Sequence, residues 1–135
     1  TAKQVEALIR GGLPAAAEQG VVVESVGENR ARVRYRFAES MIRPGGTVSG
    51  PSIFALADVS AYLMTLARIG PKALAVTTNC SIDFMRKPAA NTDLIAKTRL
   101  LKLGKLLSIC DVLVYSEGLD DPVARASLTY AIPPR

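Results

Sequence analysis

The chain has 135 residues, of which 49% are hydrophobic and 21% are charged. This length and composition suffice for a packed core and exclude a disordered segment. The 17 Lys and Arg residues outnumber the 12 Asp and Glu residues, and the net charge of +5 favours an anionic partner without identifying it. No histidine is present, which excludes Ser-His-Asp and Cys-His catalytic arrangements and histidine-bound metal.

We expect a single domain over residues 1–135 that begins with a helical segment over residues 1–20, where apolar residues recur at helical spacing between glycines. The β-branched run at residues 21–26 predicts a strand, and a turn leads from it to a second strand over residues 30–37. Four arginines alternate along the second strand and give it one basic face: Arg30, Arg32, Arg34 and Arg36. Such a face could bind phosphates, but it is more often only a solvated face, and we favour that interpretation.

A long apolar run predicts a central helix over residues 51–69. Ser49 or Gly50 is placed to cap this helix, Pro51 suits its first position, and a Gly-Pro pair ends it. The run is apolar on nearly all sides, as in a helix buried in a core. A membrane span is not expected, because Asp58 and several hydroxyl residues interrupt a run shorter than the ~20 apolar residues that a span needs.

Four further runs of alternating apolar residues predict strands over residues 73–84, 94–101, 106–115 and 123–132. In the first of these, the alternation puts Thr78 and Cys80 on one face and Thr77 and Asn79 on the other. Strands in succession beside one segregated helix are typical of an α+β fold with an antiparallel sheet. A helix that is apolar on every side needs cover on every side, so we expect the sheet to curl around it, and a second subunit could cover the rest.

The two cysteines, Cys80 and Cys110, lie in apolar strand-like runs without CxxC spacing, so neither a zinc site nor a disulfide framework is expected. Without histidine or metal-ligand spacing, we expect chemistry that uses no metal or redox cofactor. The first residues lack the basic segment and apolar stretch that are typical of a signal peptide. Together with reduced cysteines, this favours a cytoplasmic location.

Asp58 is the only charged residue between Arg43 and Arg68, and it lies on the helix that we expect to be buried. Burial of an unpaired carboxylate is costly or raises its pKa. A chain therefore seldom keeps such a group without a hydrogen-bonded partner or a catalytic task. The sequence pattern favours two interpretations about equally, a structural pairing with an arginine or a hydroxyl and a catalytic role.

A glycine-bearing loop over residues 45–50 runs into the same helix. A helix N-terminus presents free N–H groups that suit a bound carbonyl or a developing oxyanion. Pro51 has no N–H, so the amide of Gly50 or Ser52 would have to serve. Ordinary capping by Ser49, which needs no ligand, is the simpler interpretation.

Several motifs carry a resemblance to a known family. Residues 49–58 (SGPSIFALAD) resemble the HGG-x-x-x-x-L-A-D segment of hotdog-fold acyl-CoA thioesterases of the phenylacetate-degradation (PaaI-like) type. Residues 79–88 are similar to the strand of this family that ends in N-F-x-R-P, residues 104–105 to its G-K/R hinge, and residues 124–130 to its closing A-x-x-x-x-T-Y strand. The similarity covers about residues 21–133, and the order and spacing of the motifs are together more specific than any one of them.

The resemblance implies a hotdog fold, in which an antiparallel β-sheet wraps around one long central α-helix. Members of the family form homodimers edge to edge, commonly paired again as a dimer of dimers (a homotetramer), with the active site between protomers. By the match, Asp58 would act as general base or nucleophile on an acyl-CoA thioester, and the Gly50 amide would hold the carbonyl oxygen. Arg86, Lys87 and Lys105 would contact the phosphates of CoA, which is part of the substrate and not a cofactor.

This chain departs from the family pattern at Ser49, where the family has histidine, and at Pro51, where it has a second glycine. Both positions belong to the implied substrate-binding residues, together with Tyr62 and Asn79. Tyr62 lies one turn after Asp58 and could orient the carboxylate or the acyl group, although simple packing is the favoured interpretation. The departures leave reduced activity, a different acyl preference and lost catalysis open.

These observations predict an acyl-CoA thioesterase that hydrolyses its substrate to a carboxylic acid and free CoA. A non-catalytic acyl-CoA binding protein on the same scaffold is the alternative, and a hydratase is disfavoured because that activity relies on a histidine. Nucleic acid is not an expected partner, since aromatic residues make up only 5% of the chain and Trp is absent. The sequence leaves open both the acyl group and the choice between attack by Asp58 and attack by water.

Overall fold

The computed structural model describes residues 20–36, 49–70, 75–89 and 91–132. The predicted N-terminal helical segment and the glycines at positions 45–46 lie outside the described residues. In chain order, the described elements are β1 (Val21–Val26), β2 (Arg30–Tyr35), α3 (Gly50–Ile69), β3 (Val76–Phe84), β4 (Leu94–Leu103), β5 (Leu107–Ser116) and β6 (Ala124–Ala131). Each of them agrees in type with a predicted element, and the ends that fall within the described residues differ by no more than two residues. The predicted strand residues 37, 73 and 74 lie outside the described residues.

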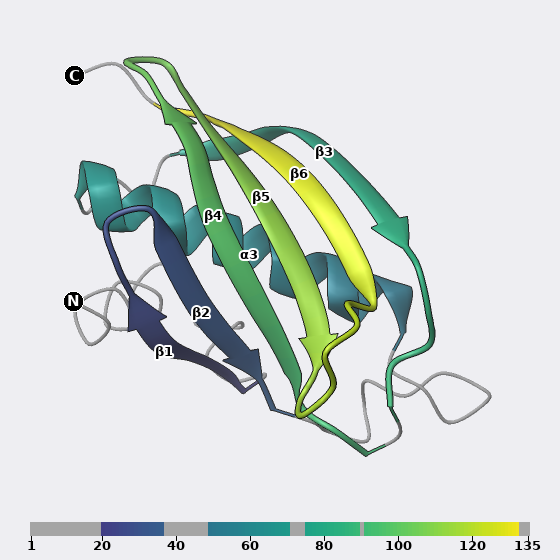
Figure 1. Cartoon of the computed structure of the whole chain (residues 1–135). Coiled ribbons are helices and arrows are strands. Elements are labelled where there is room, and N and C mark those ends of the chain that lie inside the picture. Colours follow the sequence, from purple (N-terminus) through teal and green to yellow (C-terminus); the bar gives the residue numbers. More distant parts are fainter. Residues whose placement is uncertain (1–19, 37–48, 71–74, 90, 133–135) are drawn as a thin grey trace.

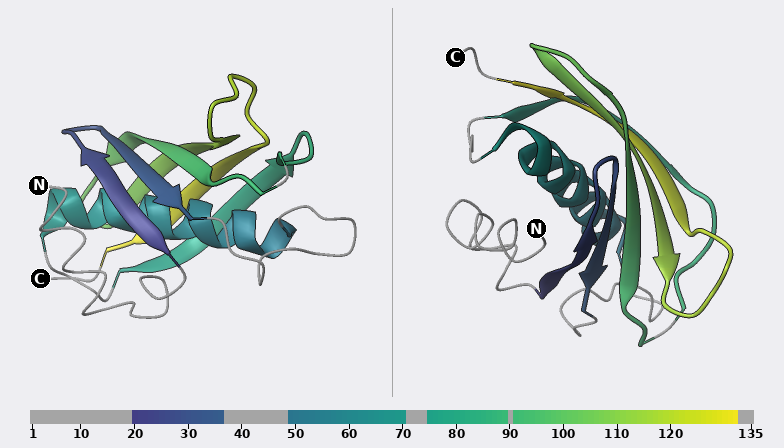
Figure 2. Two further views of the ribbon diagram at one scale, coloured as in Figure 1. Left: turned by 90° about the horizontal axis from the view of Figure 1, so that it is seen from below. Right: turned by 60° about the vertical axis from the view of Figure 1, so that its left-hand side comes forward.

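The strands form one six-stranded antiparallel sheet in the order β1-β2-β4-β5-β6-β3. The strand that follows the helix, β3, pairs with the last strand, β6, and not with its neighbour in the chain, β4. The edges of the sheet are therefore β1 and β3. The sheet bends around α3, which lies against one of its faces (Figure 1, Figure 2). This confirms the predicted α+β architecture, an antiparallel sheet around one long helix.

The core lies between the sheet and α3. Successive side chains of a strand point to opposite faces, so each central strand buries every second residue against the helix. In β2, Ala31, Val33 and Tyr35 are buried, as the alternation predicted. The arginines of the same strand lie on the outer face of the sheet, away from α3.

Helix α3 begins one residue before the predicted range of 51–69 and ends where the sequence predicts. Ser49 is its N-cap, Pro51 lies in its first turn, and Gly70, with a φ of 87°, is its C-cap. By length and composition, α3 is the one helix among the described residues that could cross a membrane. However, 56% of its most apolar window is buried inside the protein, so it is the core helix that the sheet surrounds.

A β-bulge interrupts the pairing of β3 with β6 between Thr77 and Asn79. Thr77 lies opposite Tyr130 and regular pairing resumes at Asn79, so Thr78 is the extra residue. Since paired residues point to the same face, Thr77 shares the helix side of the sheet with Tyr130. The predicted alternation, which put Thr77 and Cys80 on opposite faces, is wrong here because one extra residue shifts it by one position.

Candidate active site

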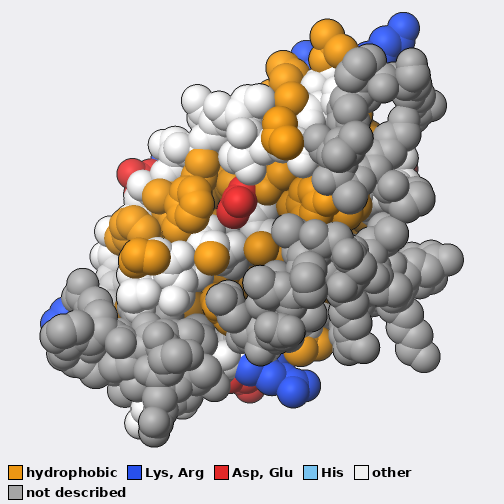
Figure 3. All heavy atoms as spheres, turned by 180° about the vertical axis from the view of Figure 1, so that it is seen from behind, with side chains coloured by type: hydrophobic (Ala, Val, Ile, Leu, Met, Phe, Trp, Pro, Cys, Tyr) orange, Lys and Arg blue, Asp and Glu red, His pale blue; other side chains and the backbone are white. Residues whose placement is uncertain are grey.

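Asp58 lies about two turns into α3 and is half-buried on the helix side of the molecule. Figure 3 shows this side, where hydrophobic side chains surround an acidic one near the middle of the face. Arg68 is the only other charged residue of α3. Among the described residues, no ion pair involves Asp58, so none of the described arginines is its partner.

Two hydroxyl groups hold one oxygen of the Asp58 carboxylate. The Thr77 hydroxyl donates to Oδ1 at 2.7 Å. The Tyr130 hydroxyl lies 2.5 Å from Oδ1 and 2.7 Å from the backbone carbonyl oxygen of Asp58. The other carboxylate oxygen, Oδ2, has no hydrogen-bond partner within the described ranges. The carboxylate is thus paired with hydroxyls, as the structural interpretation of Asp58 expected, and is held in one orientation.

Tyr130 is a permanent hydrogen-bond donor to this carboxylate. Its side chain is 3% exposed, and its ring centroid lies 5.8 Å from that of Tyr62. Burial, and then the hydrogen bond to the Asp58 carboxylate, raise the pKa of Tyr130 far above its ordinary value, so the hydroxyl stays protonated.

Burial and the charge of Asp58 also raise the pKa of Cys80, which therefore remains a thiol near neutral pH.

Replacing Tyr130 with Phe tests this raised pKa. An unfolded chain loses the tyrosine proton near pH ~10, whereas the folded protein keeps it, so stability is expected to fall as the pH rises above about 10. Tyr130 contributes about 1.4 kcal/mol of unfolding free energy per pH unit to this fall, and Tyr130→Phe removes that contribution. Urea unfolding of both proteins between about pH 8 and pH 11 measures the two slopes. Equal slopes would contradict the assignment.

Sequence reasoning did not place Thr77 or Tyr130 at the site. A tyrosine at an inward-facing strand position needs an acceptor for its buried hydroxyl, and this is a usable signal for Tyr130. Thr77 offers no comparable signal. It reaches Asp58 only because of the bulge, and the bulge depends on how β3 pairs with a strand about 50 residues further along the chain.

The N-terminus of α3 carries the predicted backbone donor. Gly50 is the first residue of the helix, and its N–H has no partner among the described residues, as is usual in a first helical turn. The ring of Phe84 lies against it, since a Cβ built on Gly50 would be 3.5 Å from Cζ of that ring. Phe84 is 54% exposed, so the amide lies beside an accessible apolar surface.

The other predicted site residues on or beside α3 have local roles. The Ser49 side chain accepts from the Ser52 amide at 3.3 Å, and the two hydroxyl oxygens are 3.0 Å apart, which confirms capping. Pro51 is exposed in the first turn. Tyr62 lies one turn beyond Asp58 and is buried in the core beside Tyr130, as the packing interpretation expects.

The remaining predicted substrate-binding residues are spread over the molecule. Asn79 is exposed on β3, but the register puts it on the face opposite to Thr77. Arg86 and Lys87 follow the end of β3, and Arg86 donates to a backbone carbonyl of the β5–β6 loop. Lys105 lies in the turn between β4 and β5, at the end of the sheet where β3 begins. One chain therefore does not bring Lys105 together with the other two cations.

An oriented carboxylate and a backbone N–H at a helix N-terminus are groups that acid-base chemistry on a carbonyl uses. Here both belong to the one long helix of an antiparallel sheet that wraps around it. This arrangement defines a hotdog-fold protein whose central helix carries candidate groups for chemistry on an acyl carbonyl.

Comparisons with known proteins agree with the hotdog fold and identify the family. The model of the Thioesterase superfamily matches residues 45–123. The crystal structure of a candidate thioesterase from Silicibacter sp. TM1040 is 47% identical, has a TM-score of 0.92, and aligns over 98% of this chain and 92% of that chain. The Escherichia coli PaaI protein of the phenylacetic acid degradation operon is 21% identical, with a TM-score of 0.82, over 98% and 93% of the two chains. Zebrafish thioesterase superfamily member 2 is 17% identical, with a TM-score of 0.85, over 98% and 99%.

No curated protein sequence matches the chain. The family model covers more than half of the 135 residues, and the Silicibacter structure is similar in sequence as well as in fold. The chain belongs to the thioesterase superfamily and has the hotdog fold, and the reaction of this superfamily is the hydrolysis of thioesters. The PaaI structure shares the fold.

Proposed function

We propose that the protein is an acyl-CoA thioesterase, in which Asp58 is the general base or nucleophile and the Gly50 amide is the oxyanion donor. The observation that carries this proposal is the Asp58 carboxylate, whose Oδ1 is held by two hydroxyl donors while Oδ2 has no partner among residues 20–36, 49–70, 75–89 and 91–132. Two hydroxyl donors on one oxygen fix the direction of the carboxylate, which a group that acts on a bound substrate requires. The reaction needs no cofactor, because CoA arrives as part of the substrate.

In the general-base form of the reaction, Oδ2 of Asp58 takes a proton from water as the water oxygen bonds to the thioester carbon. The carbonyl oxygen becomes negatively charged, and the N–H of Gly50 stabilises it. The C–S bond then breaks and the CoA thiolate takes up the proton, which leaves a carboxylic acid and free CoA. In the nucleophilic form, Oδ2 itself bonds to the carbon and the C–S bond breaks, which expels the CoA thiolate and leaves a mixed anhydride. Water then hydrolyses the anhydride to the carboxylic acid and the Asp58 carboxylate, and the proton released goes to the thiolate. Tyr130 and Thr77 are positioning residues that orient Asp58.

The Asp58 and Gly50 of one chain are too far apart to act on the same carbonyl. They are eight residues apart on α3, which is a rise of about 12 Å. Attack at a carbonyl whose oxygen is hydrogen-bonded needs both groups within about 3 Å of the reacting atoms. We therefore propose that each site combines Asp58 of one protomer with Gly50 of the partner subunit.

The edge strand β3 supports this proposal. Thr77, which contacts Asp58, lies at the start of β3, and Phe84, which lies against Gly50, is at its end. In the described sheet β3 has a neighbour on one side only, and its Val76 is 57% exposed. Two copies of β3 paired antiparallel about a two-fold axis would bring the start of one strand beside the end of the other. Asp58 of one chain would then lie near Gly50 of the partner subunit.

The mass of the active particle in solution tests the pairing. One chain has a mass of 14.3 kDa, and we expect a dimer, or a dimer of dimers, to be the active species. Sedimentation velocity measured under the conditions of the activity assay gives this mass. A fully active monomer would contradict the composite site, although it would leave membership of the superfamily unaffected.

Release of free thiol from a panel of aromatic and aliphatic acyl-CoAs tests the reaction. We expect catalytic turnover of at least one ester, with one acid and one thiol formed per cycle. The alternative, a non-catalytic acyl-CoA binding protein, is motivated by Ser49 and Pro51 in place of the family's histidine and glycine. It predicts saturable binding of the same esters in calorimetry without thiol release, and that result would exclude the enzymatic proposal.

A further inference from the structure

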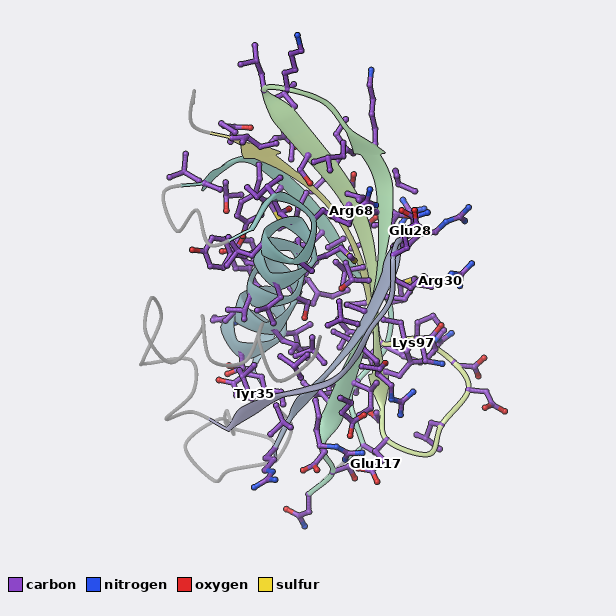
Figure 4. All side chains as sticks on the ribbon, turned by 90° about the vertical axis from the view of Figure 1, so that its left-hand side faces the viewer. Glu28, Arg30, Tyr35, Arg68, Lys97 and Glu117 are labelled. Carbon is purple, nitrogen blue, oxygen red and sulfur yellow. The ribbon has the colours of Figure 1, made fainter. Side chains whose placement is uncertain are left out.

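The outer face of the sheet carries a groove of about 690 Å³. It lies beside the β1–β2 turn, over strands β2, β4 and β5. Its lining contains four cations and one carboxylate: Arg30, Arg32, Lys97, Arg99 and Asp111. Figure 4 shows that Arg30 and Lys97 project from the side of the sheet that faces away from α3. The groove is therefore separate from the Asp58 site, which lies on the helix side.

The register of the sheet sets these cations against one another. Arg30 lies directly opposite Arg99, and Arg32 lies directly opposite Lys97. Like charges at such positions repel and destabilise a sheet. On its other side, Arg99 lies opposite Asp111 of β5, the one carboxylate of the groove, which offsets one of the four charges. The two successive pairs of cations still leave an excess of positive charge that is unfavourable for folding alone and that an anion would neutralise.

The ion pairs on the outer face compensate only part of the positive charge of the groove. Arg34, just outside the groove, is neutralised by three carboxylates, those of Glu24, Asp93 and Glu117. Within the groove, Arg32 pairs with Glu24 at 2.7 Å. No ion pair among the described residues involves Arg30 or Arg99. The arginines of β2 therefore differ along the strand. Arg34 is paired with carboxylates, whereas Arg30 and its neighbour Arg99 in the groove have no ion pair among the described residues.

The groove also has an apolar part. Val26 and Leu113 belong to its lining, and the Lys97 ammonium lies 4.7 Å from the centroid of the Tyr115 ring. The volume is within the range of sites that hold small organic ligands, roughly 300–1,000 Å³. Guanidinium groups bind phosphate oxygens through two parallel hydrogen bonds, and two unpaired arginines side by side match two adjacent phosphates.

We propose that this groove is a second binding site, for an organic diphosphate or triphosphate of nucleotide size. The arginines would bind the phosphates, and the apolar part would contact the base or sugar. A second copy of the chain is a poorer occupant, because a two-fold contact would set the same cations against each other. A nucleic acid is also poorer, because Asp111 lies among the cations and the chain has few aromatic residues for stacking.

Calorimetry with ADP as the probe, at low salt, tests the proposal. We expect saturable binding of one ADP per chain. The double variant R30Q/R99Q should weaken it about 100-fold, at roughly tenfold for each charge-assisted contact. The matched control is R125Q, which removes an arginine from the same face outside the groove, where it pairs with the exposed Asp83 at 3.2 Å. This control should bind ADP within about twofold of the wild type.

Calorimetry with three further ligands, pyrophosphate, CoA and an RNA oligonucleotide, shows which class of phosphate compound the groove binds. Inorganic pyrophosphate should bind more weakly than ADP, since it lacks the base and sugar. CoA, which carries the same diphosphate, supports the proposal if R30Q/R99Q weakens its binding and R125Q does not. The proposal would be overturned by equal affinities for pyrophosphate and ADP, by an RNA oligonucleotide that binds more tightly than ADP, or by equal losses in R30Q/R99Q and R125Q. A change of oligomeric mass in R30Q/R99Q would also overturn it, because it would identify the face as a contact between copies.

Discussion

Asp58→Asn is expected to lower kcat for thioester hydrolysis by about 10²–10⁴-fold and to leave the fold intact. The substitution keeps the shape of the side chain and an oxygen that can accept from Tyr130 and Thr77. It replaces the free oxygen Oδ2 with an amide NH₂ group, which can neither take a proton from water nor attack a carbonyl. Thiol release from the best acyl-CoA of the panel measures the loss.

Asp120→Asn is the matched control for this experiment. Asp120 is exposed in the loop between β5 and β6, so the control makes the same change of charge away from the site. Its rate is expected to stay within about twofold of the wild type, as for most surface substitutions. If Asp58→Asn hydrolyses the panel as fast as the parent, Asp58 is neither base nor nucleophile.

Gly50→Pro is expected to lower kcat by about 10²–10³-fold, because it removes the backbone N–H that we assign to the oxyanion. Proline is well tolerated at the first position of a helix. The residue before it, Ser49, already has the extended backbone that a following proline requires, with φ −70° and ψ 153°. Position 50 itself precedes Pro51, so any side chain there disfavours the helical backbone. The missing donor is therefore reported by the loss in Gly50→Pro beyond that in Gly50→Ala, which shares this restriction and keeps the N–H.

Gly50→Ala separates the effect on kcat of losing the N–H from the effect of adding a side chain at position 50. It keeps the N–H and adds a methyl group whose nearest neighbour would be the Phe84 ring, at an ordinary contact distance of 3.5 Å. We expect its kcat to remain within a few-fold of the wild type. A loss as large as that of Gly50→Pro would show that the space at this position matters, and the oxyanion role would be wrong.

Mixing the two impaired variants distinguishes a shared site from a site within one chain. In a shared site, a mixed dimer of Asp58→Asn and Gly50→Pro chains has one intact site and one that lacks both groups. Exchange of subunits is then expected to restore about one quarter of the wild-type activity, because half of the dimers are mixed and half of their sites are intact. If both groups acted within one chain, no mixture would regain activity.

Most of the secondary structure could be predicted because its signals are local. Ser49 and Pro51 mark the start of α3 through capping and through the fixed φ of proline, and Gly70 marks its end. The alternation of Ala31, Val33 and the arginines of β2 marks a strand with one buried face. These signals lie within a few residues of the structure that they specify.

The candidate site could be predicted only in part. Asp58 is recognisable because it is a single acid in an apolar helix, and Gly50 because it begins that helix. The hydroxyl partners of Asp58 were not recognised, since Thr77 and Tyr130 are more than 50 residues apart and meet through the pairing of β3 with β6. The separation of Lys105 from Arg86 could not be predicted either, because it depends on the order of the strands in the sheet.

The sequence by itself determined which segments form the helix and the strands and which carboxylate stands on the central helix, because periodicity, capping and composition act between near neighbours. Only the tertiary structure decided that β3 lies beside β6, that a bulge turns Thr77 toward Asp58, and that cations of β2 and β4 face each other across the outer face. The physical reason is that strand pairing and register are chosen by the packing of the whole sheet around α3, and no short stretch of sequence contains that information.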